Sequence, residues 1–130
     1  MAELKKRVVG LGGIFFKAKD PQKMYAWYEK HLGIQGKPGQ GAMFSWRRAD
    51  DPSQEGMTVW SIFPETTKYL NPSAAPFMIN YHVEDMDALL EALKAEGVTI
   101  EKREDHEYGS FAWIIDPEGN KIELWQPPKG

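Results

Sequence analysis

The sequence predicts an α+β fold in which one βαβββ unit occurs twice in a single chain. Segments of alternating apolar residues are interrupted by two capped helices, and the same order of elements follows a proline-bounded segment at 64–76. Short stretches also match between the halves: "KDP" at 19–21 matches "EDM" at 84–86, and "FSW" at 44–46 matches "FAW" at 111–113. We expect one domain over residues 1–130, with module one over about 8–64, a linker over 65–76 and module two over about 77–127.

The first half begins with the strand "VVGLGGIFFKA" at 8–18. Asp20 and Pro21 then supply a helix N-cap and a first helical residue, and Gly33 ends that helix. After a glycine-rich loop, "AMFSWRR" at 42–48 and "MTVWSIF" at 57–63 are predicted strands. The segment 64–76 has a proline at each end and one inside, which predicts a linker.

The second half starts again with the alternating strand "FMINYHV" at 77–83. Asp85 caps a second helix, which carries leucines at helical spacing and ends at Gly97. Strands are then expected at 98–104, 109–115 and 121–126, and the turn "DPEGN" joins the last two.

Composition excludes several classes of function. The 130 residues include no cysteine, so disulfides, thiolate zinc sites and cysteine nucleophiles are ruled out. The net charge of −3 argues against nucleic acid as a partner, and a solvated terminus explains the short basic run Lys5, Lys6 and Arg7. With no long apolar segment, we expect neither a signal peptide nor a membrane span, and hence a cytoplasmic protein. Five tryptophans favour a pocket for a flat or apolar small molecule.

Strand alternation divides the residues into two faces. The more apolar set, which includes Ile14, Ile79 and Leu124, is expected to face the helices. The mixed set then faces away from them and would line a shared cavity if the modules curl toward each other; it comprises Gly13, Phe15, Lys17, Met78, Asn80, His82, Lys121, Glu123 and Trp125.

Three stretches, "KDP…WYEKHLG", "VEDMDALLEALKAEGV" and above all "WIIDPEGNKIELWQ", resemble the vicinal oxygen chelate superfamily. That superfamily includes glyoxalase I, bleomycin-resistance proteins and extradiol dioxygenases. The resemblance covers nearly the whole chain and implies paired βαβββ modules forming a cupped sheet. It also implies a homodimer and, in metal-dependent members, one ligand on the first strand and one on the last strand of each module.

Transferring those ligand positions leaves only one usable residue. Glu123 matches the family's glutamate, whereas the other three positions fall on Gly13, Trp60 and Met78. A divalent cation needs three or more N or O ligands, which glycine, indole and thioether do not supply. We therefore expect no metal, with a rearranged divalent-metal site formed by His82 and Glu123, with Glu107 as a further candidate ligand, as the alternative.

Glu123 has two competing interpretations, an exposed strand residue or a cavity-lining acid whose pKa burial would raise. His82 is the second candidate catalytic residue, or else makes a plain polar contact. Tyr108 either edges the cavity or is an ordinary turn aromatic. The expected ligand-binding residues are Trp60, Met78, Asn80, Phe15, Lys17 and Trp125, with ordinary core packing as the alternative for Trp60 and Met78.

Two functions follow from the resemblance. The first is a metal-free protein that binds a small, partly aromatic molecule in an apolar cup. The second is a glyoxalase-like lyase or isomerase that uses Glu123 for proton transfer, with or without a divalent metal. The missing ligand positions favour the first.

Overall fold

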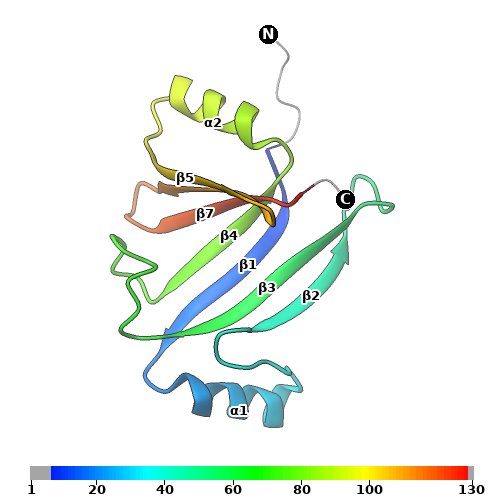
Figure 1. The fold of residues 1–130 in the computed structure, drawn as a ribbon, viewed down its shortest axis with the longest axis vertical. Helices are drawn as coiled ribbons and strands as arrows, with labels where there is room; N and C mark the ends of the chain where they lie inside the picture. Colours follow the sequence, from blue (N-terminus) through cyan, green and yellow to red (C-terminus); the bar gives the residue numbers. More distant parts are fainter. Residues whose placement is uncertain (1–6, 129–130) are drawn as a thin grey trace.

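A computed structural model describes residues 7–128 as one seven-stranded mixed sheet with two helices (Figure 1). The strand order across the sheet is β2-β3-β1-β4-β7-β6-β5. In chain order the elements are β1 (Val8–Ala18), α1 (Pro21–Leu32), β2 (Ala42–Arg47), β3 (Glu55–Pro64), β4 (Phe77–Val83), α2 (Met86–Ala95), β5 (Ile100–His106), β6 (Gly109–Ile115) and β7 (Lys121–Gln126).

Both helices begin at the predicted caps. The Asp20 side chain accepts a hydrogen bond from the Lys23 N–H, and the Asp85 side chain accepts one from the Ala88 N–H, so each satisfies an otherwise unpaired donor of the first turn. Gly33 ends α1 with φ of 70°, a backbone conformation that glycine adopts without steric cost.

The two central strands relate the halves of the chain. β1 and β4 pair antiparallel, with Gly13 opposite Asn80 and Phe15 opposite Met78. Each then has a parallel partner from its own half, β3 beside β1 and β7 beside β4. Strands far apart in sequence therefore meet at the middle of the sheet, which places the N-terminal strand next to the C-terminal half.

The first half has three strands where the repeat predicts four. Between α1 and β2 the structure shows only an isolated bridge, Lys37 to Gly41. This segment contains Pro38, which has no N–H to donate, and Gly39, whose φ of 83° is incompatible with a strand. The strand that would match β5 is consequently absent from this half.

The helices cover one face of the sheet, as alternation predicts. Under α1, Tyr25, Trp60 and Ile62 form a buried cluster with Ile14 and Phe16 packed against it. Under α2, a second cluster forms around Leu89 and Leu124, and it includes Val83, Met86, Leu90 and Ala112. In Figure 1 the two helices lie at opposite ends of the view, with the strands between them. The expected helix face is confirmed.

The opposite face, called the open face below, carries a third buried cluster. It consists of Phe15, Leu70, Met78 and Trp113. Leu70 comes from the predicted linker and is fully buried, so this segment packs onto the sheet instead of merely connecting two halves. The centre of the open face is therefore filled with side chains, and Phe15 and Met78, which were expected to line a shared cavity there, are packed in this cluster.

Neither helix among residues 7–128 has the length and apolarity needed to cross a membrane.

Candidate ligand-binding site

Glu123 is the charged residue at the centre of the open face. It lies on β7 opposite Asn80 of β4 and Trp113 of β6, and only 3% of it is exposed. Its carboxylate accepts three hydrogen bonds: from the Asn80 amide at 2.6 Å, from the Trp113 indole N–H at 2.9 Å and from the Tyr69 hydroxyl. Buried carboxylates of this kind are stable when donors take up their lone pairs. The alternative of an exposed strand residue is wrong.

Two neighbours of Glu123 respond to its charge and burial. Burial and the nearby carboxylate raise the pKa of the Tyr69 hydroxyl, so Tyr69 remains a neutral donor. Burial lowers the pKa of the Lys121 ammonium, and Glu123 opposes that change. The Lys121 Nζ donates to the Tyr69 carbonyl at 2.6 Å and lies 5.2 Å and 5.7 Å from the ring centroids of Tyr69 and Trp113.

The strand register identifies the counterpart of Glu123 in the first half. An approximate twofold axis relates β1 to β4. It places the pair Gly13–Asn80 on the pair Met78–Phe15, so Phe15 is exchanged with Asn80. Glu123 pairs with Asn80, so its counterpart is the β3 residue that pairs with Phe15, which is Ser61. The prediction of Trp60 was one residue off, and a shift of one residue moves a side chain to the other face. Trp60 accordingly packs under α1.

The four family ligand positions are therefore Gly13, Ser61, Met78 and Glu123, and they do not fit a divalent cation. Only Glu123 offers a charged oxygen, and the Ser61 hydroxyl is engaged with the Tyr25 hydroxyl at 3.4 Å. The Phe15 ring lies over Gly13, so close that even a methyl group there would clash with it. Residues 7–128 also contain no cluster of three or more His, Cys, Asp or Glu side chains able to hold a metal ion.

A pocket of about 350 Å³ lies beside Glu123, over β5 and β6. Two of its lining residues, Tyr69 and Trp113, donate hydrogen bonds to Glu123, so the buried carboxylate lies directly behind its wall. This aromatic pocket is lined by Lys68, Tyr69, Lys102, Glu104, His106, Tyr108, Phe111, Trp113 and Lys121.

The rings of the aromatic pocket form a floor with two walls. Phe111 and Trp113 lie side by side on β6 with ring planes 15° apart. Tyr69 stands nearly perpendicular to Trp113, at 89°. Tyr108 stacks on His106 with centroids 4.8 Å apart on the other side of Phe111. A flat molecule on this floor would gain offset or edge-to-face contacts with all four aromatic rings.

The predicted ligand-binding residues are absent from this pocket lining. Phe15 and Met78 are core residues of the open face. Asn80 is buried and donates to Glu123, while its own Oδ1 has no partner among the described residues. Lys17 lies near the end of β1, opposite Phe63. Trp125 stacks on Phe111 from behind the pocket and donates to the Tyr108 carbonyl at 3.2 Å.

Part of the pocket lining could have been predicted from one feature of the sequence, the turn between β6 and β7. The "DPEGN" turn fixes the β6–β7 register, so Trp113 must face Glu123 and Phe111 must face Trp125. Strand β5 then adds Lys102 and Glu104 on the same face. Tyr69 carried no such signal, because its position depends on how the segment 64–76 packs.

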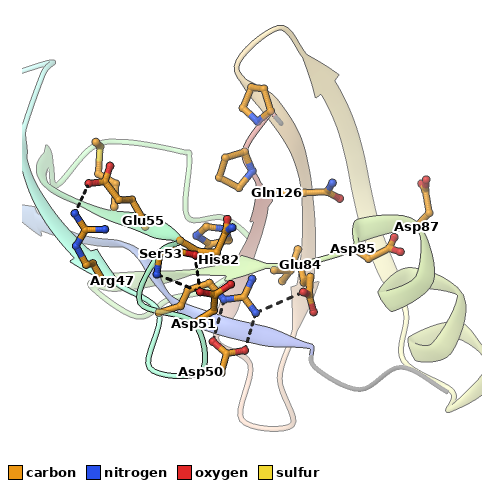
Figure 2. A pocket seen from close by; sticks show the side chains of 17 residues that line it. Arg47, Asp50, Asp51, Ser53, Glu55, His82, Glu84, Asp85, Asp87 and Gln126 are labelled. Atoms are coloured by element: carbon orange, nitrogen blue, oxygen red, sulfur yellow. Dashed lines mark hydrogen bonds and ion pairs between the residues drawn. The ribbon is translucent and has the colours of Figure 1, made fainter. Parts of the chain in front are cut away.

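His82, the other candidate catalytic residue, lies on the open face but in a separate cleft of about 1430 Å³ (Figure 2). It is two residues beyond Asn80 on β4, between the rings of Trp46 and Trp125. Burial, reinforced by the charge of Arg48, lowers the pKa of His82. Among the described residues it has no hydrogen bond to Glu123, so the two candidates do not form one catalytic pair.

The charged groups of this cleft are mostly carboxylates, with two arginines among them. Figure 2 shows Arg47 paired with Glu55. Arg48 contacts both Asp50 and Glu84, at 2.8 Å and 3.4 Å.

Comparisons with known proteins agree with this architecture. Among solved structures, methylmalonyl-CoA epimerase from Mycobacterium tuberculosis is similar, with a TM-score of 0.59, 22% identity and coverage of 98% of this chain and 94% of that chain. A Streptomyces coelicolor methylmalonyl-CoA epimerase variant in complex with 2-nitronate-propionyl-CoA has a TM-score of 0.66 and 16% identity, covering 94% and 99%. The Mn(II)-bound glyoxalase from Novosphingobium aromaticivorans has a TM-score of 0.61 and 17% identity, covering 93% and 40%.

No curated protein matches the chain by sequence. The model of one protein family, however, matches residues 10–124, which include every strand that contributes to the open face and both helices behind it. With the fold of the epimerases and the glyoxalase and a family match over nearly its whole length, this chain belongs to the Glyoxalase/Bleomycin resistance protein/Dioxygenase superfamily.

Proposed function

We propose that this protein binds a small, partly aromatic molecule in the aromatic pocket and does so without a metal. The observation that carries the proposal is the pocket lining, in which four aromatic side chains from three separate segments, Tyr69, Tyr108, Phe111 and Trp113, converge on one space of about 350 Å³. Ligand pockets of soluble proteins are of this size and are mainly lined by apolar and aromatic groups with a few polar ones.

The geometry supports binding more strongly than proton transfer. A general base must reach the proton that it removes, within hydrogen-bond distance. Glu123 is buried and already accepts three hydrogen bonds, and the Tyr69 side chain lies between it and the pocket. A lyase or isomerase that used Glu123 would therefore first have to move Tyr69.

The proposal predicts which tryptophan reports on ligand binding. In ¹H–¹⁵N spectra of the full chain, the indole N–H signal of Trp113 should shift when an aromatic metabolite enters the pocket, because its ring forms part of the floor. The signal of Trp60 should stay unchanged, because Trp60 packs under α1 on the other face. The two signals are assigned with the variants Trp113→Phe and Trp60→Phe.

A matched pair of variants separates pocket binding from surface adsorption. Phe111→Ala removes part of the pocket floor and should abolish the shift of the Trp113 signal. Trp27→Ala removes an exposed aromatic side chain on α1, away from the pocket, and should leave the shift intact. An unchanged Trp113 signal across a broad aromatic panel at millimolar concentration would contradict the proposal.

We also propose that the chain forms a homodimer in the cytoplasm. The support is strand β2, which lies at one edge of the sheet and exposes Met43 and Phe44. Sedimentation velocity should give twice the chain mass, and replacing Met43 with Lys should shift the protein toward monomer. A monomer at all concentrations would contradict the dimer.

A further inference from the structure

We infer that the molecule bound in the aromatic pocket is a flat aromatic anion, such as an aryl carboxylate, and that Lys121 determines this specificity. The inference rests on the proposed function, because it names the chemical class of ligand for the same pocket. It is carried by the charge of the lining, by the environment of Lys121 and by the placement of the lysines relative to the rings.

The pocket is positively charged although the chain is not. Three lysines line it, Lys68, Lys102 and Lys121, against one lining carboxylate, Glu104, and the buried carboxylate of Glu123 behind its wall, whereas the whole chain has a net charge of −3. Glu104 is moreover already paired with Lys102 at 2.5 Å and in contact with His106 at 2.9 Å. A negatively charged ligand is therefore attracted to this pocket, whereas a cation is repelled.

Lys121 is the lysine best placed to recognise an anion. Its side chain is only partly exposed and, among residues 7–128, forms no ion pair; it makes one hydrogen bond, to the Tyr69 carbonyl. An ammonium group has three N–H donors, so two remain for a ligand. Hydrogen bonds from a partly desolvated ammonium to a carboxylate are stronger than those between neutral groups.

The same lysine lies beside the ring floor. Its Nζ is 5.7 Å from the Trp113 ring centroid and 5.2 Å from that of Tyr69. A carboxylate attached directly to an aromatic ring could thus meet Lys121 while the ring covers Phe111 and Trp113. A ligand with its charge on a long flexible chain would not hold its ring and its charge in this arrangement. It would also lose more conformational entropy on binding than a rigid aryl carboxylate.

Three probes with the same ring system test the inference with the full chain: 2-naphthoate, its neutral isostere 2-naphthamide and the cationic 2-naphthylmethylammonium. We expect calorimetry to show naphthoate binding about tenfold tighter than naphthamide, the effect of one charge-assisted hydrogen bond, with the cation weakest. Raising the salt concentration should weaken naphthoate binding and leave naphthamide unchanged. This second measurement needs no variant.

Lys121→Met should reduce naphthoate affinity about tenfold and change naphthamide affinity less than about twofold. Lys19→Met, which removes the same charge from an exposed position between β1 and α1, should change neither. Circular dichroism confirms that both variants fold. Equal affinity for naphthoate and naphthamide, or a preference for the cation, would overturn the inference and leave the proposed function intact. Failure of all three probes to bind would count against the proposed function itself.

Discussion

At the level of single residues, the balance between burial and hydrogen bonding decides what Glu123 does. A buried carboxylate without donors would become protonated, whereas this one receives hydrogen bonds from an amide, an indole and a phenol. Glu123 ties together β4, β6 and the segment 64–76, and the aromatic pocket forms on the outer side of these contacts.

Removing the Tyr69 hydroxyl should measure the strength of that contact. Tyr69→Phe deletes one donor to a buried charge, and we expect the free energy of unfolding to fall by about 2 kcal/mol. Tyr108→Phe, at a mostly exposed tyrosine in the same pocket, should change it by less than about 0.5 kcal/mol. Urea denaturation followed by circular dichroism gives both values. Equal effects of the two variants would show that the Tyr69–Glu123 contact does not stabilise the fold.

The sequence located Glu123 but misplaced its surroundings for a definite reason. The "DPEGNKIELWQ" hairpin has a fixed register, so the position and face of Glu123 could be predicted. The first half has no equivalent turn, and the comparison by spacing landed on Trp60 instead of Ser61. On a strand, a shift of one residue moves the side chain to the opposite face of the sheet. Trp60, which was expected to line a ligand site, therefore packs in the core under α1.

At the level of elements, the ends of β1 and β3 are held apart by a side chain. β1 pairs with β3 only from Gly13 onward, and before that point the Trp46 ring occupies the space next to Gly10 and Gly56. The Trp46 indole N–H donates to the Thr58 hydroxyl at 2.9 Å, and that hydroxyl donates to the Leu11 carbonyl. The glycines that loosen the first half of β1 in the sequence therefore make room for an aromatic ring.

A side chain at Gly56 should clash with that ring. An added Cβ would overlap ring carbons of Trp46, so we expect Gly56→Ala to lower the free energy of unfolding by about 2 kcal/mol. In a Trp46→Leu background the same substitution should cost clearly less, because the overlapping carbons are gone. A double-mutant cycle by urea denaturation measures this coupling. Equal costs in both backgrounds would show that Trp46 does not constrain Gly56.

The segment 64–76 illustrates what composition alone does not reveal. The linker predicted over residues 65–76 contains neither helix nor strand, and Figure 1 shows it as an irregular loop joining β3 to β4. Yet Leu70 is fully buried and Tyr69 reaches Glu123, so the loop both fills the open face and forms one wall of the pocket. Such long-range packing leaves no local pattern in the sequence.

At the level of the whole molecule, the doubled order of elements predicted an α+β chain of two similar halves, and alternation, caps and turns agreed with it, although the first half lacks one strand of the repeat. The joining of the halves into one cupped sheet was implied by the resemblance to the family. The cavity could not be predicted in the same way. Its position depends on which side chains fill the middle of the sheet, and Phe15, Met78 and Leu70 fill it here. The remaining space lies over β5 and β6, where the lysines and aromatic rings meet.

The global stability should depend on pH through His82. Burial and the charge of Arg48 lower its pKa in the folded state, so below its ordinary value near 6.5 the unfolded chain binds more protons than the folded one. The stability contributed by neutral His82 is therefore present above about pH 6.5 and is lost as the pH falls below it.

We expect the free energy of unfolding to drop between pH 7 and pH 5, and the drop to be smaller in His82→Gln, which cannot be protonated. Urea denaturation followed by circular dichroism at the two pH values measures both drops. Carboxyl groups with lowered pKa, such as Glu96 and Asp116, titrate at lower pH than this window. An identical drop in both proteins would show that His82 is not the group responsible.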